Sequence, residues 1–449
     1  MTKRCQDESQ TCNEIDRTAI MNILMLSNTF TPHVGGVARS LERFTQEHRR
    51  RGHRVIVVAP EFERMPAIEE DVIRVPAIQN FNGSDFSVRL PIPGLVTAAL
   101  EDFQPDIIHA HHPFLLGDTA LILSSAQNAP LVFTHHTLYE QYTHYVPGDS
   151  PLMRRFVIEL STGFANLCDL VFAPSESIAE ILKSRHVTTP IEVVPTGVQV
   201  EQFANGNGRQ FREQQGIPQS AYVVGHLGRL AAEKNLEFLG RAVAEFCRKS
   251  ENAHFLLIGV GPSETTVRQH FQELGLSGRL HVAGILQGQE IADAYHAMDV
   301  FAFASKSETQ GMVLTEAMAA GRPVVALDAP GVREVVKDGE NGRLLQGEHV
   351  EDFVNALYWA ASLPADNLKI MKENIRLTAE SYALDRCAGK ALSLYESLLA
   401  QKPAQRDTEN SMWDKAVRML ETEWDIWVNR AHSAGAALNN TPSTPPRSQ

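Results

Sequence analysis

Short, almost uninterrupted apolar segments recur along this chain and alternate with segments of helical periodicity. In the first half they include NILML at 22–26 and RVIVVAP at 54–60, and in the second half YVVGHLG at 222–228 and PVVAL at 323–327. A strand that is apolar on both faces is typical of a parallel sheet covered by helices on both sides. Strands that alternate with helices therefore predict an α/β fold with doubly wound parallel sheets.

The length of the chain indicates more than one such sheet. Its 449 residues exceed one hydrophobic core of ordinary size. The polar stretch at 201–220 separates the two sets of strands, and it is typical of a linker or of the entry to a second domain. We predict two doubly wound domains, at 21–200 and 201–375. They should face each other across a cleft, because ligands bind at the carboxyl ends of parallel strands.

Three further segments flank these domains. Residues 1–20 are polar, lack the apolar core of a signal peptide and are predicted to be disordered. Residues 376–400 have a helical pattern. Residues 401–449 are predicted to contain a linker, an amphipathic helix at 412–435 and a disordered end. The amphipathic helix carries three of the four tryptophans and an acidic polar face, so we expect it to dock on this protein or on a partner.

Composition excludes several classes of protein. The chain has 41 Lys and Arg against 54 Asp and Glu, a net charge of −13, which argues against nucleic-acid binding. Its five cysteines lack CxxC spacing, so neither a zinc site nor a disulfide framework is predicted, and a reducing cytoplasm fits best. The sequence contains no apolar run of the roughly 18–20 residues that a membrane span needs, so any membrane attachment should be peripheral.

The segment SETQGMVLTEAMAAGRP, at 307–323, predicts a phosphate site at a helix N-terminus. A glycine precedes an apolar helix there, which leaves backbone amides free to donate. The candidate donors are the amides of Gly311, Met312 and Val313.

Two glutamates accompany this helix. Glu316 lies in its apolar interior and needs a polar partner, which the diol of a ribose could supply. Glu308 lies just before the helix, where a sugar on the diphosphate would be. The residues alone fit equally well with an ordinary core helix, in which Glu308 is a loop charge.

Two other loops carry groups suited to a phosphorylated ligand. Arg229 and Lys234 follow the first strand of the second domain and could reach a diphosphate, although they could also be solvated cations. Gly35 and Gly36 open the helix after the first strand of the first domain, where phosphate or sugar could approach the backbone; the alternative is a plain turn.

Two patterns invite a different interpretation. The glycines of LIGVGPSETTV resemble part of a dinucleotide fingerprint, but Glu264 occupies the place of the third glycine, so we reject a nicotinamide cofactor. HAHHPF at 109–114 and FTHHTLYEQYTHYVP at 133–147 are rich in histidine. They lack matching carboxylates, so they predict a polar and aromatic substrate pocket rather than a metal site.

Taken in order, TPHVGGV, GRLAAEKN and the two glutamates with seven residues between them resemble the retaining, nucleotide-sugar-dependent glycosyltransferases of family four, which have the GT-B fold of two Rossmann-like domains. The resemblance covers about residues 21–400. It implies that the first domain receives the acceptor, that the second binds the nucleotide sugar, and that the helix at 376–400 crosses back onto the first domain. It implies that Arg229 and Lys234 bind the diphosphate, that Glu316 binds the ribose and that Glu308 holds the donor sugar.

The same resemblance implies roles for four further residues. Ile285 and Leu286 would contact the base, and His136 would lie beside the donor sugar. The segment that contains Tyr139 and Tyr142 is similar to the acceptor-side loop of bacterial diacylglycerol glucosyltransferases.

The implied function is transfer of a hexose, with glucose as the best guess, from a UDP-sugar to a hydroxyl of a lipid such as diacylglycerol, with retention of configuration. No cofactor and no metal are expected, and the location would be the cytoplasm or, peripherally, the inner face of the cell membrane. Three alternatives stay open. They are transfer to a soluble sugar, sugar phosphate or polysaccharide, a nucleotide-sugar epimerase of similar fold, and a non-catalytic nucleotide-sugar-binding scaffold.

Overall fold

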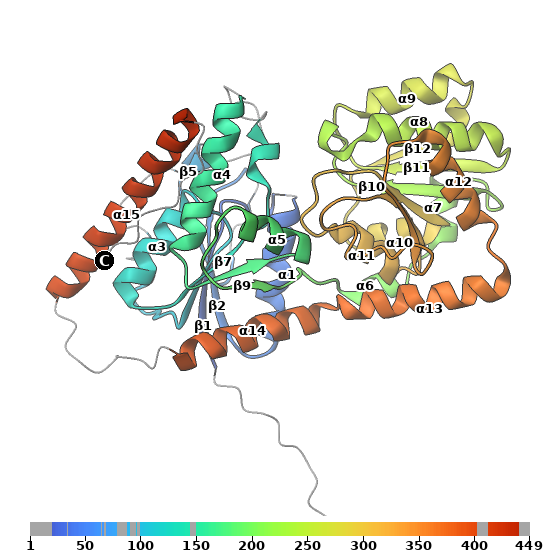
Figure 1. Cartoon of the computed structure of the whole chain (residues 1–449). Coiled ribbons are helices and arrows are strands. Elements are labelled where there is room, and N and C mark those ends of the chain that lie inside the picture. The colour runs from blue at the N-terminus through green and yellow to red at the C-terminus, as the bar shows by residue number, and fades with distance from the viewer. Residues whose placement is uncertain are drawn as a thin grey trace, which may run out of the picture.

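The computed structural model describes residues 20–401 and 412–439, apart from 34, 64, 67–68, 79–87, 90–95, 97–98 and 144–149. The described chain forms two α/β domains that lie side by side (Figure 1). Two consecutive helices run along their lower edge in this view, one beneath each domain. The leader predicted at the N-terminus and the last residues of the C-terminal tail lie outside the described part.

The first domain is built on a parallel sheet with strand order β3-β2-β1-β6-β7-β8-β9. Its strands are β1 (Asn22–Leu26), β2 (Arg54–Pro60), β3 (Val72–Val75), β6 (Ile107–Ala110), β7 (Leu131–Thr134), β8 (Leu170–Ala173) and β9 (Ile191–Val193). Its helices include α1 (Gly36–Arg50), α3 (Leu116–Gln127), α4 (Pro151–Asn166) and α5 (Glu176–Ser184), with the 3-10 helix η2 (Tyr139–Gln141) before α4. The central strands are buried apart from Arg54 at the start of β2, as their apolar sequences predicted.

The second domain repeats this plan with strand order β12-β11-β10-β13-β14-β15, again parallel. Its strands are β10 (Tyr222–Leu227), β11 (Ala253–Ile258), β12 (Leu280–Gly284), β13 (Val300–Phe303), β14 (Val324–Leu327) and β15 (Gly342–Leu345). Its helices include α8 (Leu236–Lys249), α9 (Glu264–Glu273), α10 (Gln289–Ala297), α11 (Met312–Ala319) and α12 (Val350–Ala361). Two doubly wound parallel sheets confirm the predicted fold class.

Some details differ from the sequence-based expectation. A short antiparallel pair, β4 (Ala77–Ile78) with β5 (Val88–Arg89), and the edge strand β15 were not predicted. The polar stretch 201–220 is not an extended linker. It contains α6 (Val200–Ala204) and α7 (Gly208–Gln214), because Phe203 and Phe211 are buried in the core of the second domain. This stretch is therefore the domain entry that the sequence left as one of two options.

The helix expected over 376–400 is interrupted. Helix α13 (Ala365–Ser381) packs on α11 in the second domain, and α14 (Leu384–Gln401) packs on α1 in the first. Between these two helices the chain pairs with Val198, in the connection between the domains. The Val198 amide donates to Tyr382 O at 2.8 Å, and its carbonyl accepts from Leu384 N at 2.9 Å. The crossover and the interdomain connection thus lie together, along the lower edge of Figure 1.

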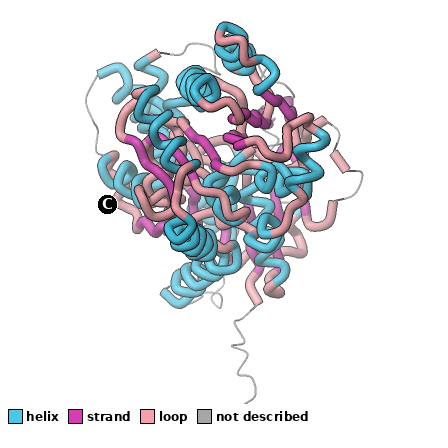
Figure 2. Tube along the Cα trace, turned by 90° about the vertical axis from the view of Figure 1, so that its right-hand side faces the viewer, coloured by secondary structure: helices cyan, strands magenta, loops and turns pink. Residues whose placement is uncertain are grey.

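Helix α15 (Met412–Asn439) docks on α3 and α4 of the first domain. Ile426 is buried in that domain's core, and Asn429 Nδ2 donates to Leu160 O at 3.2 Å. A Cβ atom at Gly163 would lie 1.8 Å from Asn429 Oδ1, so any larger residue there would displace the Asn429 side chain from this contact. The sequence predicted that this helix docks on the protein or on a partner, and in the structure it docks on the protein itself. The view of Figure 2, turned by 90°, shows the helices packed around the two sheets.

Membrane-spanning character is lacking in the described helices: none of them is both long and apolar enough to cross a bilayer.

Helix α1 buries a histidine without a hydrogen-bond partner. His48 lies against Phe44 and Tyr395, and neither ring nitrogen meets a partner in the described part of the chain. Burial, and then the neighbouring His53, lower the pKa of His48 from its ordinary value of 6.5 to about 3. The unfolded chain takes up this proton below pH 6.5, but the folded chain does not until about pH 3. The contribution of His48 to stability is therefore fully present above pH 6.5 and is lost as the pH falls through this window.

We expect His48→Leu to weaken the acid sensitivity of the fold. A group with this shift costs up to about 1.4 kcal/mol per pH unit within the window, and leucine has no proton to take up. The measurement is the melting temperature at pH 7.5 and at pH 5.5, with the exposed His349→Asn as the control. Equal losses on acidification in the wild type and in His48→Leu would contradict the assignment.

Candidate active site at the domain boundary

Two helix N-termini meet where the domains face each other. Gly311 precedes α11 in the left-handed region, with φ of 67°, and no described side chain caps this helix. A Cβ atom at Gly36, in the first turn of α1, would lie 3.5 Å from Met312 Cε. The glycine-rich start of α1 and the uncapped start of α11, with the predicted amides of Gly311, Met312 and Val313, therefore lie at one place. Gly35 precedes Gly36 there in extended backbone.

Lys234 and Glu308 form an ion pair beside this point. Lys234 Nζ lies 2.5 Å from Glu308 Oε1, and both side chains are mostly buried. Burial lowers the pKa of Lys234, but the charge of Glu308 and the nearby Tyr142 raise it, and the net shift is upward. The amine is therefore charged at neutral pH. Arg229 lies on the same loop and is half exposed, with its Nε 3.9 Å from a carboxylate oxygen of Glu233.

Glu316 is 1% exposed and has two protein partners. Arg43 Nη2 donates to its Oε1 at 2.5 Å, and the Tyr295 hydroxyl donates to its Oε2 at 3.1 Å. Arg43 belongs to α1 in the first domain and also donates to Gly197 O at 3.1 Å. The polar partner that the sequence required of Glu316 is thus supplied here by the protein, and a role toward a ribose stays a prediction.

His136 lies next to the loop that carries Glu308. Thr309 Oγ1 donates to His136 O at 2.8 Å across the domain boundary. The ring is held by His111, whose Nδ1 lies 2.8 Å from His136 Nε2 with the two rings stacked. Burial, followed by the neighbouring His135, lowers the pKa of His136 to about 3, so the imidazole is neutral at physiological pH. It can exchange hydrogen bonds with a ligand but carries no charge.

The two predicted acceptor-side tyrosines lie in different surroundings. Tyr142 of the first domain helps to raise the pKa of Lys234 in the second, so Tyr142 lies at the domain boundary. Tyr139 packs against Phe114 and His135 inside the first domain, and its buried hydroxyl meets no partner among the described residues. The other histidine and tyrosine of this loop, at 144 and 145, lie outside the described part.

The segment predicted to contact a base follows β12. Gly284 has φ of 69°, Ile285 is exposed and Leu286 packs partly on the core of the second domain. Nearby, the glycines of the rejected dinucleotide pattern have a packing role. A Cβ atom at Gly259 would lie 1.9 Å from Gly228 O, and one at Gly261 would lie 2.3 Å from Leu230 O. These glycines allow the loop that carries Arg229 to approach β11.

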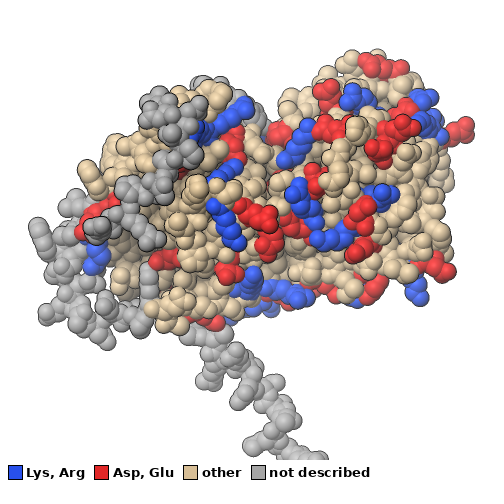
Figure 3. Space-filling view, in the orientation of Figure 1, with Lys and Arg blue, Asp and Glu red and all other residues tan. Residues whose placement is uncertain are grey.

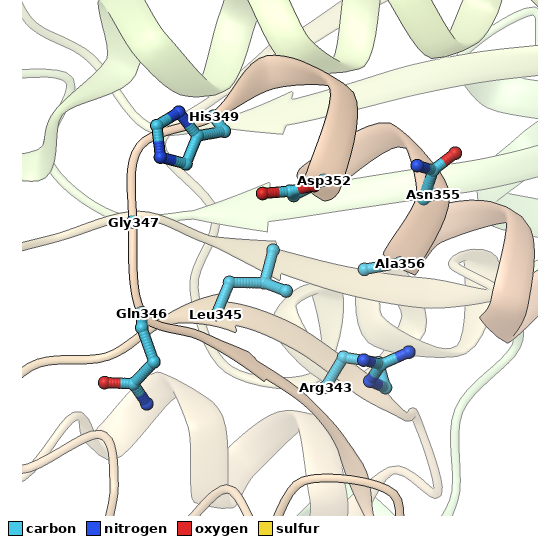
Figure 4. Close-up of a pocket in the computed structure, with 8 residues that line it drawn as sticks. All are labelled: Arg343, Leu345, Gln346, Gly347, His349, Asp352, Asn355 and Ala356. Carbon is cyan, nitrogen blue, oxygen red and sulfur yellow. The ribbon is translucent and has the colours of Figure 1, made fainter.

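A surface pocket of about 520 Å³ lies elsewhere, at the end of β15 and the start of α12 (Figure 4). It is lined by Arg343, Leu345, Gln346, Gly347, His349, Asp352, Asn355 and Ala356. None of the predicted donor or acceptor residues lines it. The better candidate site is the domain boundary, which carries the paired charges Arg43–Glu316 and Lys234–Glu308. Figure 3 shows a notch between the two domains at its top. Within the described residues, no group of three or more His, Cys, Asp or Glu side chains is arranged to hold a metal ion.

Arg43, Tyr295 and His111 are the residues that the sequence analysis missed. For Arg43 a signal existed, since a charged residue between the apolar Leu41 and Phe44 on a core-facing helix needs a buried partner. His111 was seen only as part of a histidine-rich segment, and nothing in the sequence paired it with His136.

Two family models account for most of the chain. Residues 34–202 match the model described as Glycosyltransferase Family 4, and residues 208–378 match that described as Glycosyl transferases group 1. The chain is a family-four glycosyltransferase. Its two doubly wound domains are the two halves of the GT-B fold.

Known proteins agree with this assignment. The transferase is 29% identical over 372 residues to an alpha-monoglucosyldiacylglycerol synthase of Streptococcus pneumoniae, which covers 81% of this chain and 83% of that one. It is 27% identical over 356 residues to a GDP-mannose-dependent alpha-mannosyltransferase of Corynebacterium glutamicum, over 77% and 81% of the two chains. The structure of sucrose-phosphate synthase from Thermosynechococcus elongatus has the same fold, with a TM-score of 0.70, 22% identity and coverage of 85% and 100%.

We expect the buried pair in the transferase to stabilise the domain boundary. Arg43→Met would leave Glu316 charged and without its cationic partner, which costs about 3–5 kcal/mol for a buried pair. The double variant Arg43→Met with Glu316→Gln should recover part of that loss. The measurement is the urea midpoint, and the control is Arg50→Met on the exposed side of α1. A loss no larger than that of the control would show that the pair does not stabilise the boundary.

Proposed function

We propose that this glycosyltransferase moves a hexose, with glucose as the best guess, from a UDP-sugar to a hydroxyl of a lipid acceptor such as diacylglycerol. The observation that carries the proposal is the meeting of Lys234, Glu308 and His136 beside the uncapped N-terminus of α11. Cationic and amide donors at one point suit a diphosphate, and a carboxylate with a neutral imidazole suits the hydroxyls of a sugar.

The reaction breaks the bond between the anomeric carbon and the diphosphate oxygen and forms a bond from that carbon to the acceptor oxygen. The leaving UDP gains charge, which Lys234, Arg229 and the amides of α11 would stabilise. The acceptor oxygen would attack from the face of the sugar that the diphosphate leaves, so the configuration is retained. The acceptor proton would go to the departing phosphate. The balance of this step requires neither a metal ion nor a cofactor.

Binding of the donor would exchange partners at both glutamates. Lys234 would turn from Glu308 to the diphosphate, which frees Glu308 for a sugar hydroxyl. Arg43 would yield one oxygen of Glu316 to the ribose, while Tyr295 keeps the other. The glycines at 35 and 36 would let the phosphate approach the start of α1, and Ile285 and Leu286 would border the base.

The lipid acceptor is supported by the Streptococcus relative, whose name states a glucosyldiacylglycerol product. The Corynebacterium relative, named for GDP-mannose, favours an alternative donor. Soluble acceptors remain the alternative on the acceptor side. A cytoplasmic protein with peripheral contact to the inner face of the membrane would meet both substrates.

Release of nucleoside diphosphate tests donor and acceptor together. Purified protein receives UDP-glucose, UDP-galactose, UDP-N-acetylglucosamine or GDP-mannose, with and without diacylglycerol in mixed micelles. We expect release that needs UDP-glucose and the lipid together. Lipid-independent release would overturn the lipid acceptor, and release from GDP-mannose alone would overturn the UDP-sugar.

Substitution of Lys234 tests the donor site. Lys234→Gln should lower kcat/KM for the donor by about 10²-fold or more, because it removes a cation that stabilises the leaving diphosphate. Lys249→Gln, on the exposed end of α8, should leave the rate unchanged. A rate for Lys234→Gln close to that of the control would remove Lys234 from the site.

A further inference from the structure

Helix α15 is held to the first domain by one face alone. Ile426, Ser433, Ala436 and Ala437 on that face are buried. Along the contact, Arg430 Nη2 lies 2.7 Å from Asp118 Oδ2 and Arg418 Nε donates to Ser125 O at 3.3 Å. These contacts fix the orientation of the helix, so the residues on its opposite face point away from the first domain.

The outward face presents two tryptophans. Trp424 is 70% exposed and Trp427 is 65% exposed, among the most exposed large apolar side chains of the described residues. They lie three positions apart and so share one side of the helix, followed on that side by Ala431 and Ala434. The apolar stripe of this helix thus faces away from the domain that the helix covers.

The described part of the stripe suits a lipid surface, which needs no large contact area. Each exposed indole offers roughly 150–250 Å² of surface for burial. Indole rings favour the boundary between a bilayer and water, because an apolar body carries a polar N–H group.

The charges around the stripe indicate the type of surface. Glu421 and Glu423 are exposed beside the tryptophans, while Arg430 is engaged with Asp118 and lies over the Trp427 ring at 5.7 Å. An acidic border is repelled by anionic headgroups and tolerates uncharged or zwitterionic ones. In the view of Figure 3, basic and acidic side chains of the described surface are interspersed, without a wide basic field.

Helix α15 is mounted on the first domain, away from the boundary where the candidate site lies. The helix lies on the far side of the first domain from the second (Figure 1) and packs on α4, which in turn packs on η2 in the acceptor-side loop. It begins after both family models have ended. It is thus an addition to the glycosyltransferase core, mounted on the domain that would receive the acceptor.

We propose that Trp424 and Trp427 anchor this protein peripherally to a lipid surface of uncharged or zwitterionic headgroups, and so hold the acceptor-side domain at the bilayer. The inference rests on the proposed function in that a lipid acceptor gives the contact its use. Binding itself needs neither donor nor turnover, so the two can fail separately.

The test is flotation of the full chain with vesicles of phosphatidylcholine and diacylglycerol, without donor. Trp424→Ser with Trp427→Ser should lower partitioning into vesicles about tenfold or more, since each indole loses burial in the interface. The matched control is Ile370→Ser with Leu377→Ser, which removes two side chains on α13 that are 62% and 50% exposed. Melting temperatures should stay unchanged in both double variants.

Three outcomes would overturn the proposal. They are vesicle binding that survives the loss of both tryptophans, equal loss in the α13 control, and a wild-type dimer in sedimentation that becomes monomeric in the tryptophan variant. Stronger binding to vesicles rich in phosphatidylglycerol would overturn the choice of headgroup. Nucleoside diphosphate release with a short-chain diacylglycerol dispersed below its micellar concentration reports on the proposed function alone, and should be equal in wild type and variant.

Discussion

The buried ion pair between Arg43 and Glu316 is the interaction on which the arrangement of the site depends. It joins α1 of the first domain to α11 of the second, the two helices whose N-termini meet at Gly36 and Met312. A carboxylate that is 1% exposed cannot stay charged without a partner. The pair therefore holds the two helix starts together, where a phosphate would bind.

The same constraint explains why the charges of the site are paired with one another. Lys234 satisfies Glu308, and Arg43 with Tyr295 satisfies Glu316, so each mostly buried carboxylate has a positive or hydroxyl donor. A nucleotide sugar offers both replacements at once, a diphosphate for the cation and hydroxyls for the carboxylates. Binding can then exchange partners without leaving a buried charge unpaired, which keeps the cost of opening the pairs low.

How far the sequence reached can be judged from particular residues. Apolar runs such as RVIVVAP predicted buried strands because burial on both faces leaves a local signal, whereas GRLL of β15 lies at a sheet edge and was missed. The partnership of Arg43 with Glu316 spans 273 positions, and no local pattern encodes it. The break between α13 and α14, at Tyr382 and Ala383, contains neither glycine nor proline. The chain pairs there with Val198, a distant contact that leaves no local signal in the sequence. The tail helix was predicted by its period, but the period does not say which face packs.

Which face of α15 packs on the first domain bears on how an acceptor could be met. The apolar residues that made 412–435 amphipathic were expected to dock the helix, yet Asn429 and Arg430 make polar contacts to the domain while Trp424 faces solvent. The residues proposed to bind the donor lie mostly in the second domain, whereas the tail helix is mounted on the first. If Trp424 and Trp427 anchor the first domain at a lipid surface, they set where the acceptor is met without touching the proposed donor site.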